Sequence, residues 1–446
     1  MDKEWEKVPE MISKTPLYNL NAVLREVGLT PDVLRAWERR YQLPVPRRTA
    51  GGHRLYSQYD IETIKWLKER QREGLSISRA VELWREIALV SDPLEGQAPS
   101  TTTSLPHQTG NNSEIDSTRE LWVKACLEYD TAAAENILNQ SLSMFPVEKV
   151  CIGVLQKGLN DIGQKWYAGN ASAQQEHFAT ALAHNRIQAL IAGTPKPILK
   201  KTVLVGCPAG ELHTFPGLLI NLFLRRQGFN VIYLGADVPQ EQLLETVDQL
   251  KPDLVILTAQ RLSSAKTLSE ISLLLNSRSQ LMAYGGLIFT IIPALTLRIA
   301  GHYLGNSLEN SIEQIKNLVS SPVLTVKPAD ISAEMQTLAS EFEEHRSLIE
   351  HRFIHLAREK GIEIPYLQAS HFLSEYLSAA ITLGNLDFID PEITWLKDLK
   401  RQINNPTNLI TFLEIYDQAV KQELEKIGTP INNWLASTIL KIKELL

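Results

Sequence analysis

The chain has 446 residues, of which 44% are hydrophobic and 22% are charged, a composition ordinary for a globular protein of roughly two to four domains. No apolar run approaches the roughly 18 residues needed to span a bilayer, and the polar, acidic start is unlike a signal peptide, so we expect a cytoplasmic protein with no membrane partner. A net charge of −6 argues against nucleic-acid binding by the whole chain, and three widely spaced cysteines indicate neither a disulfide framework nor a metal site.

Residues 15–90 are predicted to be helical and contain a cluster of arginines. Thr30 and Pro31 have the residue types of an N-cap and a first helical position, which predicts that a helix begins there. In this helix Arg35 and Arg39 stand one turn apart, and such a face can bind guanine or phosphate in the major groove of DNA. The glycine-rich turn that follows predicts a wing. We expect DNA contacts from the helix and the wing, by Arg35, Arg39, Arg40, Arg48, His53, Arg54 and Tyr56.

The rest of the chain is predicted to form three further domains after a linker. Residues 91–116 are rich in small and polar residue types and predict a flexible linker. Residues 117–195 have helical spacing and predict a bundle of four helices. Residues 200–320 alternate apolar runs with helical patterns, as in a doubly wound, flavodoxin-like parallel sheet. Residues 330–446 predict an all-α bundle of five or six helices with an aromatic core, and binding of a protein partner is the alternative role for this domain. The expected fold class is therefore multidomain, α and α/β.

One motif lies where such a sheet binds its ligands. The predicted strands are 202–205, 231–234, 254–258, 280–284 and a short edge strand near 303. The segment Glu211-Leu212-His213-Thr214-Phe215-Pro216-Gly217 follows the first of them, directly before a helix. Ligands of open α/β sheets bind at the carboxyl ends of the strands. A ligand site is therefore predicted at Glu211 and His213.

The first domain resembles the winged helix-turn-helix domain of MerR-family regulators over about residues 17–89. The resemblance rests on Leu-Arg-Ala-Trp-Glu-Arg-Arg-Tyr, which begins at Leu34, and on Gly-Gly-His-Arg-Leu-Tyr-Ser, which begins at Gly51. It implies binding to double-stranded promoter DNA and a transcriptional regulator rather than an enzyme.

Glu211-x-His213 resembles the Asp/Glu-x-His-x-x-Gly motif of cobalamin-binding domains. In that family the histidine is the lower axial ligand of cobalt, and the acid orients its imidazole. The resemblance therefore implies cobalamin as cofactor and His213 as the metal ligand. The positions that it assigns to the corrin, its nucleotide tail or their support are Glu211, Gly217, Gly235, Thr258, Gly285 and Gly286.

The helical bundle resembles the cap of light-sensing MerR regulators of the CarH and LitR type. Trp166 and the pair Glu176-His177 are separated by the nine residues of the Trp-x9-Glu-His signature. The resemblance implies that Trp166 shields the upper face of the corrin beside the adenosyl group of adenosylcobalamin. His177 is expected to be structural or to pack on the corrin rather than to bind cobalt. For this family a dimer or tetramer represses in the dark and comes apart in light.

Two departures from that family keep an alternative open. Pro216 occupies the place of the motif glycine, which falls one position later at Gly217. Tyr167 stands where the photoreceptors have a histidine that binds cobalt after illumination. The alternative is a MerR-type regulator that has lost cobalamin binding and responds to another ligand or to a protein partner. A cobalamin enzyme is disfavoured, because the chain has no separate βα barrel for a substrate.

Overall fold

The computed structural model describes residues 16–41, 43–48, 54–72, 112–323, 326–360, 365–391 and 406–444, with four isolated positions between residues 77 and 84. The chain divides into two compact units, Met1–Pro195 and Lys196–Leu446. Among the described residues, no helix has the length and apolar character needed to cross a bilayer.

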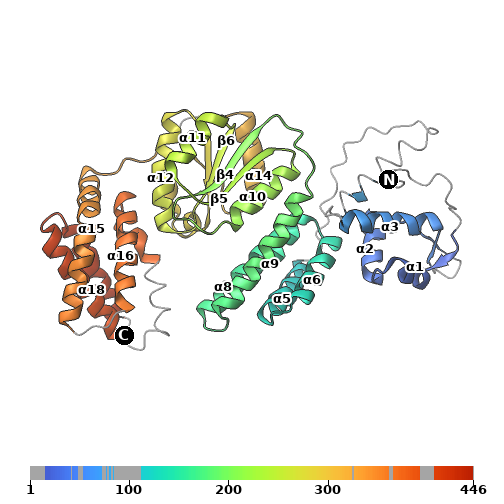
Figure 1. Ribbon diagram of the computed structural model, residues 1–446, viewed down its shortest axis with the longest axis horizontal. Helices are drawn as coiled ribbons and strands as arrows, with labels where there is room; N and C mark the ends of the chain where they lie inside the picture. Colours follow the sequence, from blue (N-terminus) through green and yellow to red (C-terminus); the bar gives the residue numbers. More distant parts are fainter. Residues whose placement is uncertain are drawn as a thin grey trace. The chain divides into compact units, whose positions relative to one another are not determined.

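The N-terminal unit begins with a small head that contains α1, α2 and α3 (Figure 1). The head also has a three-stranded antiparallel sheet in the order β1-β3-β2. The first helix begins after Asn19, whose side chain accepts a hydrogen bond from the N–H of Ala22, and ends at Gly28 in the left-handed conformation. The predicted break before the second helix is thereby confirmed. The elements are β1 (Tyr18–Asn19), α1 (Leu20–Val27), α2 (Pro31–Tyr41), β2 (Arg47–Arg48), β3 (Arg54–Tyr56) and α3 (Gln58–Arg72).

The head has its own apolar core. Leu34 and Trp37 of α2 are fully buried in it, as are Ile61 and Ile64 of α3. The predicted wing is present as the antiparallel pair β2 and β3. Its turn, residues 49–53, and most of the predicted helix 76–89 lie outside the described residues.

The helical bundle follows, and it begins earlier than predicted. Its first helix starts at Asn112, inside the stretch 91–116 that was predicted as linker, because an amphipathic pattern with buried Ile115 already begins there. Gly158 allows the first and third helices to pack closely, since a Cβ at that position would lie 2.8 Å from the Trp122 ring. The third of the four predicted helices is a continuous run of α7, η1 and α8. The elements are α5 (Asn112–Leu127), α6 (Thr131–Met144), α7 (Val147–Val150), the π-helical η1 (Cys151–Gln156), α8 (Lys157–Tyr167) and α9 (Ala173–Ala192).

The C-terminal unit contains the predicted doubly wound sheet, with five parallel strands in the order β5-β4-β6-β7-β8. In Figure 1, α10 and α14 lie on one side of the sheet and α11 and α12 on the other. The chain reverses its direction across the sheet at β4, and the carboxyl end of that strand is therefore the expected ligand position. The elements are β4 (Thr202–Pro208), α10 (Phe215–Arg226), β5 (Asn230–Val238), α11 (Gln240–Leu250), β6 (Leu254–Thr258), α12 (Leu262–Ser277), β7 (Met282–Gly285), α13 (Leu287–Ile291), η2 (Pro293–Arg298), β8 (His302–Tyr303) and α14 (Leu308–Ser320).

The same unit ends in a bundle with four long described helices. Phe353, Phe412 and Tyr416 form its aromatic centre, with the rings of Phe353 and Phe412 5.1 Å apart. Phe372 is exposed and is not part of this aromatic centre. Residues 392–405, which belong to the predicted bundle of five or six helices, lie outside the described residues. The elements are α15 (Ala333–Glu359), α16 (Pro365–Thr382), η3 (Leu386–Ile389), α18 (Pro406–Leu424) and α19 (Thr429–Lys443).

Candidate functional site

The loop that carries Glu211 and His213 connects β4 to α10 and is fixed at its base by the end of β5. The N–H of Gly210 donates to Oδ1 of Asp237 at 2.8 Å, and the N–H of Asp237 donates to the carbonyl of Glu211 at 3.0 Å. The N–H of Glu211 donates to the carbonyl of Pro208 at 3.0 Å. Sequence reasoning missed Asp237, because its role depends on a pairing between distant strands.

The carboxylate of Glu211 is fully buried and accepts four hydrogen bonds. Its Oε1 accepts from the backbone N–H and from Nδ1 of His213, at 2.9 and 2.7 Å. Its Oε2 accepts from the N–H of Gln260 at 2.7 Å and from the hydroxyl of Ser264 at 2.6 Å. Burial alone would raise the pKa of Glu211, but the hydrogen bonds from His213, Ser264 and Gln260 hold it at about 2. The group is therefore an anion at neutral pH.

This anion fixes the orientation and the tautomer of the imidazole. A carboxylate only accepts hydrogen bonds, so Nδ1 of His213 carries the proton that is shared with Glu211. In the neutral form of the ring the lone pair is then on Nε2, and the His213 side chain is 61% exposed. An exposed imidazole with a carboxylate behind it is a typical metal-ligating arrangement.

Glycines open the space beside this loop. A Cβ at Gly235 or at Gly285 would meet no atom within 4 Å. Gly286 has a different role, since its φ is 132° and a Cβ there would lie 1.8 Å from the carbonyl oxygen of Ala259. Gly286 is therefore required by the fold, whereas Gly235 and Gly285 border space that a ligand can enter.

Two further features of this edge fit a large, partly apolar ligand with polar arms. The Nε2 of Gln260 is buried without a hydrogen-bond partner among the described residues, while its Oε1 accepts from the N–H of Leu287 at 2.9 Å. Such an orphaned donor can serve an amide or phosphate oxygen of a ligand. Leu212 and Leu287 expose apolar side chains next to His213 and Gly286 in the chain. These residues fit cobalamin, whose corrin is apolar and whose periphery carries amides and a phosphate.

The remaining predicted residues of the sheet lie deeper. Gly217 is in the buried first turn of α10, where Pro216 is tolerated because no helical partner is needed for its missing N–H. Thr258 is buried at the end of β6, with its Oγ1 3.4 Å from Sγ of Cys207. The ring of Tyr233 packs beside them, with Cε2 3.6 Å from the place of a Gly217 Cβ. Its hydroxyl donates to the carbonyl of Thr214 at 3.3 Å, and burial raises its pKa to about 12.

The predicted residues of the bundle lie at the end of α8 and the start of α9. Trp166 is 39% exposed, and its ring centroid lies 4.9 Å from that of Tyr167. The carboxylate of Glu176 is 2.8 Å from Nδ1 of the exposed His177 and accepts from the hydroxyl of Thr180 at 2.9 Å. Trp166 thus exposes part of its ring, and Glu176 supports its own helix.

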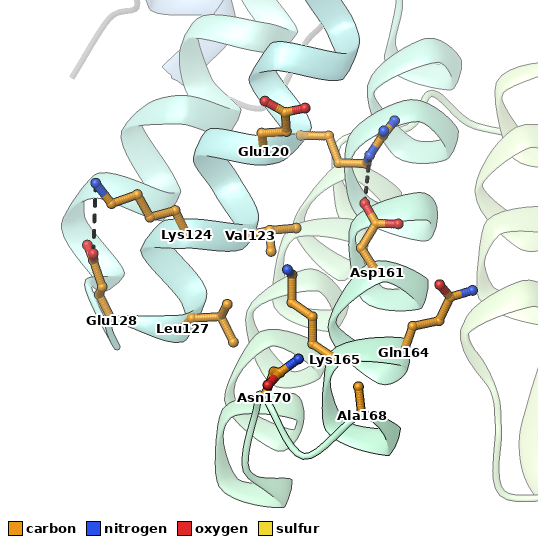
Figure 2. A pocket seen from close by; sticks show the side chains of 11 residues that line it. Glu120, Val123, Lys124, Leu127, Glu128, Asp161, Gln164, Lys165, Ala168 and Asn170 are labelled. Atoms are coloured by element: carbon orange, nitrogen blue, oxygen red, sulfur yellow. Dashed lines mark hydrogen bonds and ion pairs between the residues drawn. The ribbon is translucent and has the colours of Figure 1, made fainter. Parts of the chain in front are cut away.

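A charged cleft of about 600 Å³ lies elsewhere in the bundle, between α5 and α8 (Figure 2). Arg119 and Asp161 form an ion pair across it at 2.8 Å. Lys165 lines it, and because successive helical residues are about 100° apart, Trp166 points to another face of α8. The cleft is therefore separate from the predicted aromatic surface. Its lining residues are Arg119, Glu120, Val123, Lys124, Leu127, Glu128, Asp161, Gln164, Lys165, Ala168 and Asn170.

The head presents part of the predicted DNA-binding surface. Arg35 and Arg39 are exposed on α2, on the face opposite the buried Trp37. Arg40 and Arg48 lie in α2 and β2, but their side chains are outside the described part of the structure, as is all of His53.

Tyr56 and Arg54 require a correction. Tyr56 is fully buried, its hydroxyl donates to Glu38, and burial together with the Glu38 hydrogen bond raises its pKa. Arg54 donates from Nε to Oε2 of Glu38 at 2.7 Å and is mostly covered. Both side chains were predicted to face DNA, but each is hydrogen-bonded to Glu38, and that of Tyr56 is fully buried. The sequence feature that could have predicted these contacts is Glu38, the single acid within the arginine cluster.

Comparisons with known proteins agree with this arrangement. A model described as MerR HTH family regulatory protein matches residues 18–87, and two models described as B12 binding domain match residues 118–191 and 201–306. The chain is 30% identical over 249 residues to the HTH-type transcriptional repressor CarH of Myxococcus xanthus, which covers 56% of this chain and 81% of that protein. It is 28% identical over 242 residues to the repressor CarA of the same organism, with 54% and 75% covered. It is 27% identical over 256 residues to the regulator MlrA of Salmonella typhimurium, with 49% and 99% covered.

Proposed function

The chain belongs to the MerR-type DNA-binding regulators with cobalamin-binding domains that include CarH and CarA, and on this premise we propose that it is a light-responsive transcription factor whose signal is adenosylcobalamin. CarH and CarA are both transcriptional repressors. We propose three properties of this regulator: the form of cobalamin that it binds, its response to light, and the effect of that response on promoter binding.

The observation that carries the proposal is the Glu211–His213 pair. A buried anion with a pKa of about 2 keeps Nδ1 of His213 protonated, and Nε2 is thereby left to bind a metal. The Glu211 carboxylate, which already holds the ring and the backbone N–H of His213, lowers the entropic cost of ligation. His213 would be the lower ligand of cobalt, and Gly235 and Gly285 would admit the ligand beside it.

The other residues have proposed roles that follow from their surroundings. Trp166, with its partly exposed ring, would cover the upper face of the corrin. The buried donor of Gln260 would bind a polar arm of the ligand. Adenosylcobalamin, when bound, supplies a light-sensitive upper group. Tyr167 cannot replace a histidine as a second nitrogen ligand, so we expect no bis-histidine state after illumination.

We further propose that self-association connects the ligand to the promoter. A dimer or tetramer would link several DNA-binding heads, and linked heads bind one DNA site far more tightly than a single head. Repression in the dark would then be released when light lowers the oligomeric state.

The test uses the purified full chain with adenosylcobalamin, kept dark or illuminated. We expect a dark absorption spectrum of the bound cofactor, a loss of molecular mass in light by size-exclusion chromatography with light scattering, and weaker binding to promoter DNA in light. Hydroxocobalamin provides the control, since it lacks the light-sensitive group and should give no light-dependent change in mass. An unchanged mass and unchanged DNA affinity after full photolysis would contradict the photoswitch.

The position of Tyr233 favours a second candidate function. Its ring packs against Gly217 and close to Thr258, the residues expected to line the slot for the nucleotide tail. If the ring keeps this position, the chain is a MerR-type regulator that responds to another ligand or to a protein partner. Equilibrium dialysis against hydroxocobalamin distinguishes the two candidate functions, because only the cobalamin-sensing regulator should bind it. If the wild-type protein binds hydroxocobalamin, Tyr233→Ala should bind it at least as tightly as the wild type.

A further inference from the structure

The C-terminal helical bundle packs directly on α12 of the sheet domain. Leu268 of α12, Phe342 of α15 and Leu377 of α16 are all buried in one continuous hydrophobic core. Nζ of Lys266 on α12 lies 2.6 Å from Oε1 of Glu343 on α15 and 2.7 Å from Oγ of Ser378 on α16. The two helices are thus fixed to α12 by apolar contacts and by an ion pair whose side chains are 22% (Lys266) and 41% (Glu343) exposed.

The N-terminal end of α12 is part of the candidate site. Ser264 donates its hydroxyl to Glu211 and accepts from the N–H of Arg261 at 3.2 Å. The N–H of Gln260 also donates to Glu211. The guanidinium of Arg261 hydrogen-bonds the side chain of Tyr376 on α16.

A connected set of polar contacts therefore runs from the C-terminal bundle to His213. It passes from Tyr376 to Arg261, through the first turn of α12, to the carboxylate of Glu211 and then to Nδ1 of the imidazole. Lys266 holds the same helix to α15 and α16 little more than one turn further on. A displacement of α16 would displace the donors on which the orientation of Glu211 depends.

We infer that the C-terminal bundle is a positioning module for the metal-ligating histidine, with Tyr376 and Lys266 as its positioning residues. This inference rests on the proposed role of His213. A module placed in this way gives the regulator a second input, because any ligand or partner that moves α16 changes the affinity for cobalamin. By linkage, bound cobalamin would change the affinity of the bundle for that partner by the same factor.

The test compares three full-length variants. Tyr376→Phe removes only the hydroxyl that meets Arg261, and Lys266→Met removes the ion pair to Glu343 while keeping most of the apolar stem. Tyr416→Phe is the matched control, because its hydroxyl lies 2.7 Å from Oγ of Ser374 inside the bundle and does not reach α12. The readouts are the dissociation constant for hydroxocobalamin in dim light and the ring ¹H–¹⁵N signals of His213 in cobalamin-free protein at one fixed pH.

We expect Tyr376→Phe and Lys266→Met each to weaken hydroxocobalamin binding by about fivefold, which corresponds to the loss of one ordinary hydrogen bond. Both should shift the His213 ring signals, and Tyr416→Phe should change neither readout. Wild-type affinity with unshifted ring signals in Tyr376→Phe and Lys266→Met would overturn the inference. If the wild-type protein does not bind hydroxocobalamin, the proposed function fails, and the ring signals still decide whether the bundle positions His213.

Discussion

Glu211 is held by four hydrogen bonds, and its negative charge is what fixes the His213 tautomer. We predict that Glu211→Gln lowers the free energy of unfolding by about 1–3 kcal/mol at neutral pH, because an amide cannot accept all of these bonds. Chemical denaturation of the two proteins measures the difference. Glu245→Gln on the exposed face of α11 is the control and should be neutral. An equally small effect of both changes would show that the anion does not stabilise the loop.

The destabilisation caused by Glu211→Gln should disappear in acid. The pKa of Glu211 in the folded protein is about 2, below its ordinary value of 4.5. The charge therefore stabilises the fold fully above pH 4.5, and this contribution is lost as the pH falls toward 2. Denaturation at several pH values should show the wild type and Glu211→Gln converging between pH 4.5 and 2. A constant difference across that range would contradict the assigned pKa.

The neighbouring glycines Gly285 and Gly286 allow an effect on folding to be distinguished from an effect on cobalamin binding. Gly286→Ala places a Cβ 1.8 Å from the carbonyl oxygen of Ala259 at a φ of 132°, so we expect clear destabilisation. Gly285→Ala meets no atom within 4 Å and should fold normally. If Gly285 borders the ligand, this second variant should still bind cobalamin more weakly. Thermal unfolding and equilibrium dialysis measure the two effects, and normal cobalamin binding by Gly285→Ala would remove that glycine from the site.

At the scale of elements, α2 is the helix that we propose to bind in the major groove of DNA. We predict that Arg39→Ala weakens binding to selected promoter duplexes by about tenfold, in line with 1–3 kcal/mol for a bidentate base contact. Fluorescence anisotropy at several salt concentrations is the measurement. If the slope of log affinity against log salt concentration falls by about 1 in magnitude, Arg39 contacts a phosphate instead. Arg278→Ala, on the sheet domain, is the control, and equal affinities for both variants would exclude α2 as the reading helix.

The elements could largely be predicted from local patterns. The strands and the helix break at Gly28 follow from apolar runs and cap residues, and they lie where predicted. The assignment of Tyr56 to the DNA surface was wrong, because a partner on another element, Glu38, determines where the ring goes. Ser264 and Gln260 were missed for the same reason, since they meet Glu211 only after β4 and β6 pair in the sheet.

At the scale of the whole molecule, family resemblance gave the order of the modules but not the role of the last one. The C-terminal bundle shares its hydrophobic core with the sheet domain. Helical spacing predicted an aromatic core within residues 330–446, and Phe353 and Tyr416 lie at its centre. No pattern within these helices could predict that they pack on α12. That contact depends on shape and on one partly buried lysine, Lys266, and neither has a sequence signature.

Direct ligation of cobalt by His213 is tested most directly by electron paramagnetic resonance of the protein reconstituted with cob(II)alamin. The axial nitrogen splits the cobalt lines into triplets if it is ¹⁴N and into doublets if it is ¹⁵N. We predict triplets for the unlabelled protein and doublets when only the histidines carry ¹⁵N. Triplets that persist in the labelled protein would show that the cofactor's own base, and not His213, binds the metal, and would contradict the account.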